Sequence, residues 1–193
     1  NILEYFREFQ DRYEGKIKAI STGYHKLDQK IYGWSNKGRL ITIAGASSMG
    51  KTTFALNLAE KSAESVPTAY FSFEMSASEL VEKLVSKHAR IDSEILADDS
   101  RMKNELTADH FELINIAQNK IGSLKLHIDD SGKRKHSQIR NKIKLLVQEK
   151  GVKVVFIDYL QLLTPDKRYS STRESINEIT AGLKALAQEL KIE

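Results

Sequence analysis

Residues 45–52, GASSMGKT, have the residue types and the spacing of a phosphate-binding loop. They match the pattern GxxxxGK(S/T) in full, and they stand between an apolar run and a helical pattern. Small residues let the backbone wrap a phosphate with its N–H groups pointing inward, and a helix that starts near Lys51 adds the positive end of its dipole. The predicted binding residues are Gly45, Ala46, Ser47, Ser48, Met49, Gly50, Lys51, Thr52 and Thr53.

Two side chains of this loop have separate expected roles. Lys51 would reach the β and γ phosphates of a nucleotide, and the Thr52 hydroxyl would hold Mg²⁺, a hard ion that prefers oxygen ligands. The alternative is a glycine-rich turn that only lets a strand and a helix pack closely. The complete match in the required context favours nucleotide binding.

Two acidic residues are candidates for binding the metal ion and for activating water. Asp158 ends the apolar run 154–157, where a second metal-binding group would stand, although an aspartate there is also often a cap or turn residue. Glu74 follows Tyr70, Phe71 and Phe73, and if the two strands are parallel its carboxylate lies at the edge that holds the phosphates. It could then orient water as a general base. Spacing alone is equally compatible with Glu74 capping the helix that follows.

The elements that would position these groups alternate between strand and helix. Ser76 with Glu79, and Thr107, mark helix starts, Gly151 marks a helix end, and apolar residues at helical spacing continue through 176–190. Runs that are apolar on both faces are typical of buried parallel strands. We therefore predict an α/β fold with a mainly parallel sheet and helices on both faces. The predicted strands are residues 40–46, 68–75, 124–130 and 152–160.

The first residues form a short amphipathic helix. Ile2, Phe6, Phe9 and Tyr13 share one stripe, and the helix is predicted to end near Gly15. Packing of this stripe on its own domain is the favoured interpretation, and docking on a neighbouring subunit is the alternative.

Composition limits the remaining possibilities. At 193 residues the chain fits one domain, and the absence of cysteine excludes disulfides and thiolate metal sites. No run has the length of a membrane span or the character of a signal peptide, so we expect a soluble, cytoplasmic protein. The 30 basic and 26 acidic residues permit a polyanionic partner without requiring one. The five histidines lack metal-ligand spacing, and none is assigned a metal role.

Residues 164–175, TPDKRYSSTRES, are predicted to form a mobile basic loop after the Asp158 strand. Lys167, Arg168 and Arg173 could pair with nucleic-acid phosphates, and Tyr169 could stack on a base. From the residues alone, an ordinary surface loop is the favoured interpretation. A second basic cluster at residues 131–144 is predicted to be the solvated start of a helix.

Five segments together resemble the RecA-like motor domain of replicative DNA helicases of the DnaB type. The resemblance runs from about residue 21 to the end and implies a RecA-like P-loop NTPase that uses ATP and Mg²⁺. By motif it implies that Lys51 and Thr52 are the phosphate lysine and the magnesium hydroxyl, Glu74 the catalytic glutamate and Asp158 the second metal-side acid. The segments are STGYHKLDQKIYGW, LITIAGASSMGKTTFALNLA, YFSFEMSASELVEKL, VVFIDYLQLL and RESINEITAGLKALAQEL.

The resemblance also implies an assembly and a function. We expect a ring of identical subunits, a hexamer, that encircles single-stranded DNA, hydrolyses ATP at subunit interfaces, translocates and unwinds duplex at the replication fork. Residues 1–20 would be a linker helix and its connection, and residues 21–193 the ATPase domain. Lys167, Arg168 and Arg173 would face the DNA channel. Primase and a helicase loader are expected partners, in a bacterial cell or a phage-infected host, with no membrane partner.

Two departures from the family pattern matter. Gly45 stands where members often have alanine, and we expect no functional loss from it. The chain ends at Glu193, where the family continues with a core strand carrying a sensor glutamine, a second DNA loop and a basic finger, so we expect a fragment that lacks the last strands and hydrolyses ATP weakly or not at all.

Other functions would use the same loop and acids. A RecA-superfamily filament or switch protein, of the recombinase or clock type, would bind ATP without unwinding DNA. A small-molecule kinase is disfavoured because no lid insertion is found.

Overall fold

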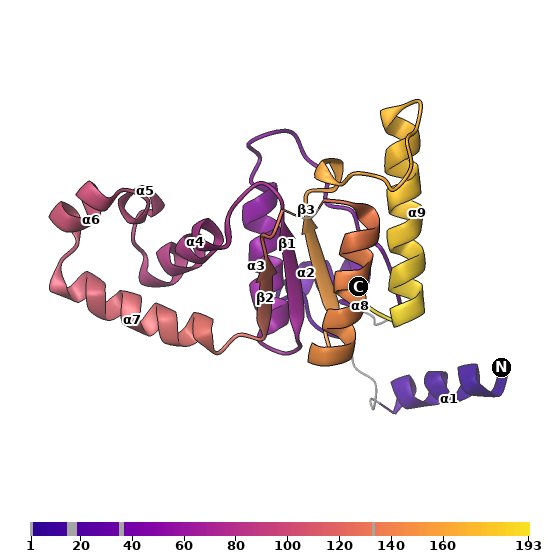
Figure 1. Cartoon of the computed structure of the whole chain (residues 1–193). Helices are drawn as coiled ribbons and strands as arrows, with labels where there is room; N and C mark the ends of the chain where they lie inside the picture. Colours follow the sequence, from indigo (N-terminus) through magenta and orange to yellow (C-terminus); the bar gives the residue numbers. More distant parts are fainter. Residues whose placement is uncertain (1, 15–18, 35–36, 133) are drawn as a thin grey trace.

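The computed structural model describes residues 2–14, 19–34, 37–132 and 134–193, and it confirms the predicted α/β class. Three parallel strands form a sheet in the order β2–β1–β3. Helices cover both of its faces, so that the described residues form three layers (Figure 1). The strands are β1 (Thr68–Ser72), β2 (Leu126–Asp129) and β3 (Val154–Asp158).

Alternate residues of the strands point to opposite faces of the sheet, and each face contributes to a separate hydrophobic core. Ala69 and Phe71 of β1 face α8 (His136–Lys150) and α9 (Thr172–Leu190), whereas Tyr70 faces the other way. The second half packs against α3 (Lys51–Ala63) and α4 (Ala77–Ala89). Because β1 is central and buried at every residue, it carries apolar groups on both faces, as a parallel strand does.

The predicted helix boundaries are mostly confirmed. Ser76 and Glu79 form the reciprocal capping box that starts α4, and Thr107 caps α7 (Ala108–Gly122). Gly151 ends α8 in the left-handed region, with φ of 66°. The predicted strands at 68–75, 124–130 and 152–160 are shorter than expected, since pairing stops where the chain turns away from its neighbours.

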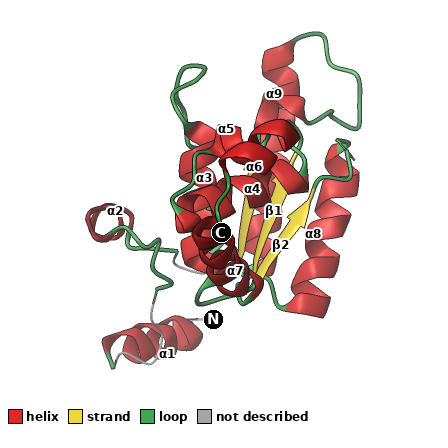
Figure 2. Cartoon of the chain, turned by 90° about the vertical axis from the view of Figure 1, so that its left-hand side faces the viewer, coloured by secondary structure: helices red, strands yellow, loops and turns green. Residues whose placement is uncertain are grey.

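Several short helices were not predicted from sequence. They are α2 (His25–Ile31), α5 (Ser93–Leu96), α6 (Asp99–Glu105) and the 3-10 turn η1 (Leu160–Leu162). The helices α4 to α7 extend from the sheet as a projection with a small core of its own around Val85, Ala89 and Ala117 (Figures 1 and 2). No described helix is both long and apolar enough to span a bilayer.

The predicted strand at residues 40–46 is wrong: these residues form no strand in the structure. A strand needs a partner for its N–H and C=O groups. Residues 40–46 do not pair with the outer edge of β3, because the backbone of Glu193 forms hydrogen bonds there. The Val155 N–H donates to the Glu193 carbonyl (2.8 Å), and the Glu193 N–H donates to the Lys153 carbonyl (3.0 Å). The segment therefore lies across a cavity from β3, and Leu40, Ile41 and Ile43 are partly exposed.

The amino-terminal helix α1 (Ile2–Tyr13) forms as predicted and lies apart from the sheet in both views (Figures 1 and 2). Its stripe of Ile2, Phe6, Phe9 and Tyr13 is between 59% and 86% exposed, so the favoured interpretation, burial on its own domain, is wrong. The predicted end at Gly15 lies outside the described residues.

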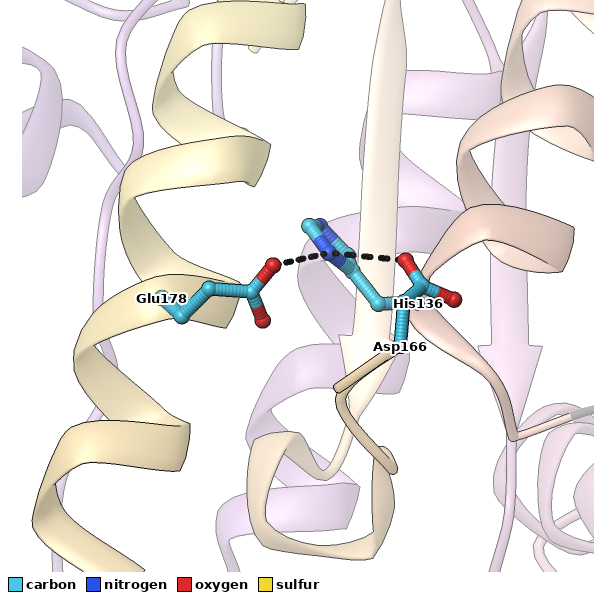
Figure 3. A group of neighbouring side chains, drawn as sticks. All are labelled: His136, Asp166 and Glu178. Carbon is cyan, nitrogen blue, oxygen red and sulfur yellow. Dashed lines mark ion pairs between the residues drawn. The ribbon is translucent and has the colours of Figure 1, made fainter. Parts of the chain in front are cut away.

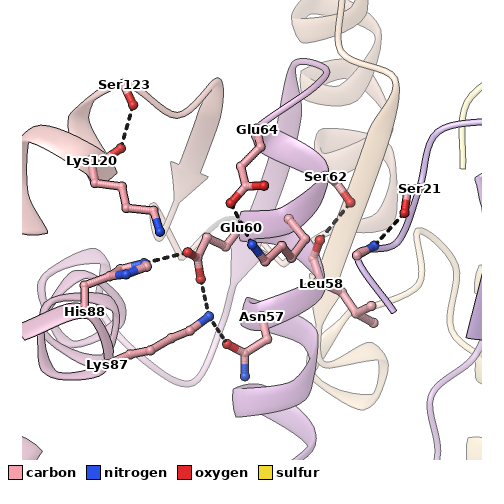
Figure 4. Close-up of polar contacts among 12 residues, drawn as sticks. Ser21, Asn57, Leu58, Glu60, Ser62, Glu64, Lys87, His88, Lys120 and Ser123 are labelled. Atoms are coloured by element: carbon pink, nitrogen blue, oxygen red, sulfur yellow. Dashed lines mark hydrogen bonds and ion pairs between the residues drawn. The ribbon is translucent and has the colours of Figure 1, made fainter. Parts of the chain in front are cut away.

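A buried ionic network joins α3 to α4. The Glu60 side chain is fully buried, and its two oxygens lie 2.6 Å from Lys87 Nζ and 2.6 Å from His88 Nε2 (Figure 4). Burial alone would raise the pKa of Glu60, but hydrogen bonds from Lys87 and His88, and their charge, lower it below the ordinary 4.5. The network thus fixes the carboxyl half of the helix that starts at the phosphate-binding loop.

Replacing Glu60 with glutamine should lower the free energy of unfolding by about 1.5–3 kcal/mol at pH 7, because bonds to a buried charge are lost. The pKa of Glu60 is lower in the folded than in the unfolded chain, so its contribution is complete above pH 4.5 and disappears as pH falls through the folded value. Urea denaturation of the wild type and of Glu60→Gln, at pH values from 7 to 3, measures the difference in the free energy of unfolding and its dependence on pH. Glu64→Gln, which removes an exposed pair with Lys61, is the matched control and should change stability by less than about 1 kcal/mol.

Candidate nucleotide-binding site

The candidate phosphate-binding loop, residues 45–52, leads into α3 as predicted, but the strand expected before it does not form. Gly50 is the N-cap residue, with φ of 80°, a region that favours glycine, and Ser48 also has a positive φ of 60°. Within the described part of the chain, the amides of residues 45–50 make no hydrogen bond. These donors and the free N–H groups of the first turn of α3 are available to an anion.

Lys51 lies folded back over the loop. Its Nζ donates a hydrogen bond of 2.7 Å to the Ala46 carbonyl. A phosphate oxygen carries more charge than a carbonyl oxygen and would be the stronger acceptor for this ammonium. A Cβ at Gly45 would lie 3.5 Å from Lys51 Cγ, an ordinary contact, so alanine also fits at position 45.

The register of the sheet brings the two candidate acids to one edge. Strands β1 and β3 are parallel, and Ser72 lies opposite Asp158 at their carboxyl ends. Glu74 follows two residues beyond Ser72, in the bend between β1 and α4. The parallel arrangement on which the predicted role of Glu74 depends is therefore present.

Asp158 is buried, 8% exposed, and is held by a tyrosine that sequence reasoning did not assign to the site. The Tyr70 hydroxyl donates a 2.9 Å hydrogen bond to Asp158 Oδ2. Burial, and then the charge and hydrogen bond of Asp158, raise the pKa of Tyr70, so the hydroxyl remains a donor. Tyr70 lies opposite Phe156 in the sheet, so Tyr70 is the diagonal neighbour of Asp158 on the same face. This contact depends on the strand register and could not be predicted from the sequence pattern.

Glu74 is exposed and makes no hydrogen bond to any described residue. The cap of the following helix is made by Ser76 and Glu79: the Ser76 hydroxyl accepts from the Glu79 N–H (3.2 Å), and the Glu79 carboxylate accepts from the Ser76 N–H (2.7 Å). The interpretation of Glu74 as a capping residue is therefore wrong.

One cavity of about 810 Å³ connects these groups. It lies between the loop, residues 40–44 and β3, and it is large enough for a nucleotide. Ala46, Met49 and Thr53 belong to the predicted site but do not line the cavity. The predicted residues that do line it are Gly45, Ser47, Ser48, Gly50, Lys51, Thr52, Glu74 and Asp158.

The donor set fits a nucleotide with a magnesium ion. Free amides and one ammonium match phosphate oxygens. The Thr52 hydroxyl and Asp158 Oδ1 supply hard oxygen atoms, and neither makes a hydrogen bond within the described residues, so both are available to Mg²⁺.

The predicted DNA loop is shorter than expected. Helix α9 begins at Thr172, capped by Ser171, so Arg173 lies in its first turn and not in the loop. Lys167, Arg168 and Arg173 are exposed, and none forms an ion pair with a described residue. The second basic cluster includes Lys133, which lies outside the described residues, and the start of α8.

A parallel sheet covered on both faces, with a loop of this pattern leading into α3, is the arrangement of P-loop ATPase domains, and it matches the RecA-like ATPase domain of DnaB-like helicases. The sequence profile of the DnaB-like helicase C terminal domain matches residues 19–193, and the chain belongs to this family.

Relatives and solved structures agree with this assignment. The chain is 34% identical over 183 residues to the replicative DNA helicase DnaB of Leifsonia xyli, and 35% identical over 184 residues to that of Geobacillus stearothermophilus. These matches cover 93% of this chain but only 38% and 39% of the relatives.

Two solved structures share the fold. One is an ATPase domain that superposes with a TM-score of 0.89 at 26% identity, covering 100% of this chain and 68% of the other. The second is a DnaB-like replicative helicase, described with its interactions with primase, which superposes with a TM-score of 0.83 at 25% identity, covering 97% and 45%.

Proposed function

We propose that this chain is the ATP-hydrolysing motor of a replicative DNA helicase that translocates on single-stranded DNA and unwinds duplex at the fork. The observation that carries the proposal is the cavity that joins the loop, Glu74 and Asp158 in a chain of this family. Residues 21–193 would be the ATPase domain and residues 1–20 the linker.

Each residue of the site has a separable role in this proposal. The loop amides and Lys51 hold the triphosphate, and Thr52 with Asp158 holds Mg²⁺, which neutralises phosphate charge when bound. The Tyr70 hydroxyl fixes the orientation of the Asp158 carboxylate. Glu74, exposed to the cavity and without a hydrogen bond to any described residue, positions the attacking water and accepts its proton.

The assembly is part of the proposal. We infer a ring of identical subunits, a hexamer, with ATP hydrolysed at the interfaces between them. The exposed apolar stripe of α1 supports docking of residues 1–20 on a neighbouring subunit, since such a stripe is unfavourable in water. The solved DnaB-like helicase, which is described with its interactions with primase, supports primase as a partner, and a loader and a cytoplasmic location are expected for the same function.

The basic groups beside α9 would contact DNA. Lys167, Arg168 and Arg173 would pair with phosphates irrespective of sequence, and Tyr169, 37% exposed, could stack on a base. The absence of ion pairs to these cations within the described residues supports this role, because their charge is not neutralised internally.

The test is strand displacement from a forked DNA by the full-length protein, with and without alanine at Lys167, Arg168 and Arg173. The triple variant should bind single-stranded DNA more weakly, flatten the slope of log affinity against log salt by about 2, and unwind more slowly, because fewer counterions are released.

Alanine at Lys103, Lys120 and Lys150 removes the same charge elsewhere and is the control, with an unchanged slope expected. ATP hydrolysis stimulated by DNA without strand displacement would identify a filament or switch protein instead. An unchanged salt slope in the first variant would remove these residues from the DNA path.

A further inference from the structure

We propose that His136, Asp166 and Glu178 form a binding site for a divalent transition-metal ion such as Zn²⁺. His136 is the first residue of α8, Asp166 lies in the segment before α9, and Glu178 is on α9. The two carboxylates flank the imidazole (Figure 3). One possible ligand atom from each residue lies within 4.8 Å of the other two.

The imidazole is buried without a hydrogen-bond partner. Its side chain is 2% exposed, and neither ring nitrogen bonds to a described residue. His136 Nδ1 lies 3.9 Å from Asp166 Oδ2 and 3.7 Å from Glu178 Oε1, both beyond hydrogen-bond distance. A single nitrogen carries at most one proton and cannot donate to two carboxylates well, whereas one cation could be shared by Nδ1 and both carboxylates.

The two carboxylates are oriented for such an ion. Asp166 Oδ1 accepts from the Ser137 hydroxyl (2.5 Å) and amide (3.2 Å), which leaves Oδ2 to face His136. Glu178 Oε2 is also buried without a partner among the described residues. Buried carboxylates are usually paired with a cation or coordinate a metal, and an ion between these three side chains would provide that partner.

The ligand set selects the class of ion. One imidazole nitrogen and two carboxylate oxygens suit Zn²⁺ and its neighbours, with bonds of about 2.0–2.2 Å, whereas Mg²⁺ prefers oxygen alone. The side chains need to close only slightly to reach these lengths. Asp166 and Glu178 are 36% and 32% exposed, so water can complete the coordination shell.

A glycine makes room for this arrangement. A Cβ at Gly182, one turn after Glu178, would overlap the His136 ring, so glycine lets α9 pass directly over the imidazole. The ion would join the start of α8 to α9 and to the beginning of the segment that carries Lys167 and Arg168. It would therefore be a structural site that holds this segment in place, and it does not depend on the proposed function.

The test is calorimetric titration of the full-length protein with Zn²⁺ in the absence of nucleotide. Wild type should bind one ion per chain at this site. Asp166→Asn and Glu178→Gln retain side-chain size, and each should weaken the affinity at least about tenfold. Glu189→Gln, on the same helix and 52% exposed, is the matched control and should bind as wild type does.

Circular dichroism confirms that each variant is folded. No Zn²⁺ binding by wild type, or equal affinity in either cluster variant, would overturn the site. If wild type bound no Zn²⁺, another side chain would have to neutralise these carboxylates. Arg140 is the candidate, because it lies one turn along α8 and its Nε is also buried without a partner among the described residues.

Discussion

Glu74→Gln should abolish ATP turnover by the full-length protein while leaving ATP binding intact. Glutamine has the size of glutamate but cannot accept the proton of the attacking water, and loss of a general base costs about 10²–10⁴-fold. Glu74 is exposed to the cavity and is not part of the α4 cap, so the fold should not change. Steady-state hydrolysis and equilibrium binding of a fluorescent ATP analogue measure the two effects separately.

A second glutamate serves as the control for this experiment. Glu112 is exposed on α7, away from the cavity, and Glu112→Gln should hydrolyse ATP at the normal rate. If Glu74→Gln also kept the normal rate, the assignment of Glu74 as the catalytic base would be wrong, and the base would have to come from another residue or subunit.

Lys51→Ala should remove both nucleotide binding and hydrolysis. Lys51 supplies the ammonium of the loop, and loss of one preorganised donor to a developing charge costs about 10²–10³-fold in rate. Its hydrogen bond in the structure is to the Ala46 carbonyl, near the surface, so stability should change by no more than about 0.5 kcal/mol. Titration with the ATP analogue, together with thermal unfolding, measures both quantities.

Lys61→Ala is the control: it also removes one positive charge, but from the other end of α3, and it should bind nucleotide normally. The two assays also separate the roles of the site residues, because Glu74→Gln is expected to lose turnover alone. Normal ATP affinity in Lys51→Ala would contradict the proposed phosphate site.

Local sequence patterns predicted much of the fold, because helix caps and turns are determined by interactions between residues close together in the sequence. Ser76 with Glu79 fixes the start of α4 by hydrogen bonds within one turn, and Gly151 ends α8 by its positive φ. The phosphate-binding role of residues 45–52 was predicted in the same way, because the whole motif lies within eight consecutive residues. The short helices α5 and α6 were missed because a few residues carry too little periodicity.

Long-range pairing explains what the sequence could not show. Residues 40–46 have the apolar pattern of a strand, but whether they join the sheet depends on which segment bonds to the edge of β3, and in this structure that is Glu193. The contact of Tyr70 with Asp158 depends likewise on strand register, and the α1 stripe could not be assigned a partner from its periodicity.

By itself the sequence determined the α/β class, and it predicted the phosphate-binding loop and the two acids, because each is encoded in a short pattern of residue types. Only the tertiary structure placed Glu74 and Asp158 at one edge around one cavity, and only it brought His136 to Asp166 and Glu178. Those three residues share no motif spacing, and their approach results from the packing of α8 and α9 on the same face of the sheet. Contacts between segments distant in sequence are decided by packing and strand order, which local patterns do not contain.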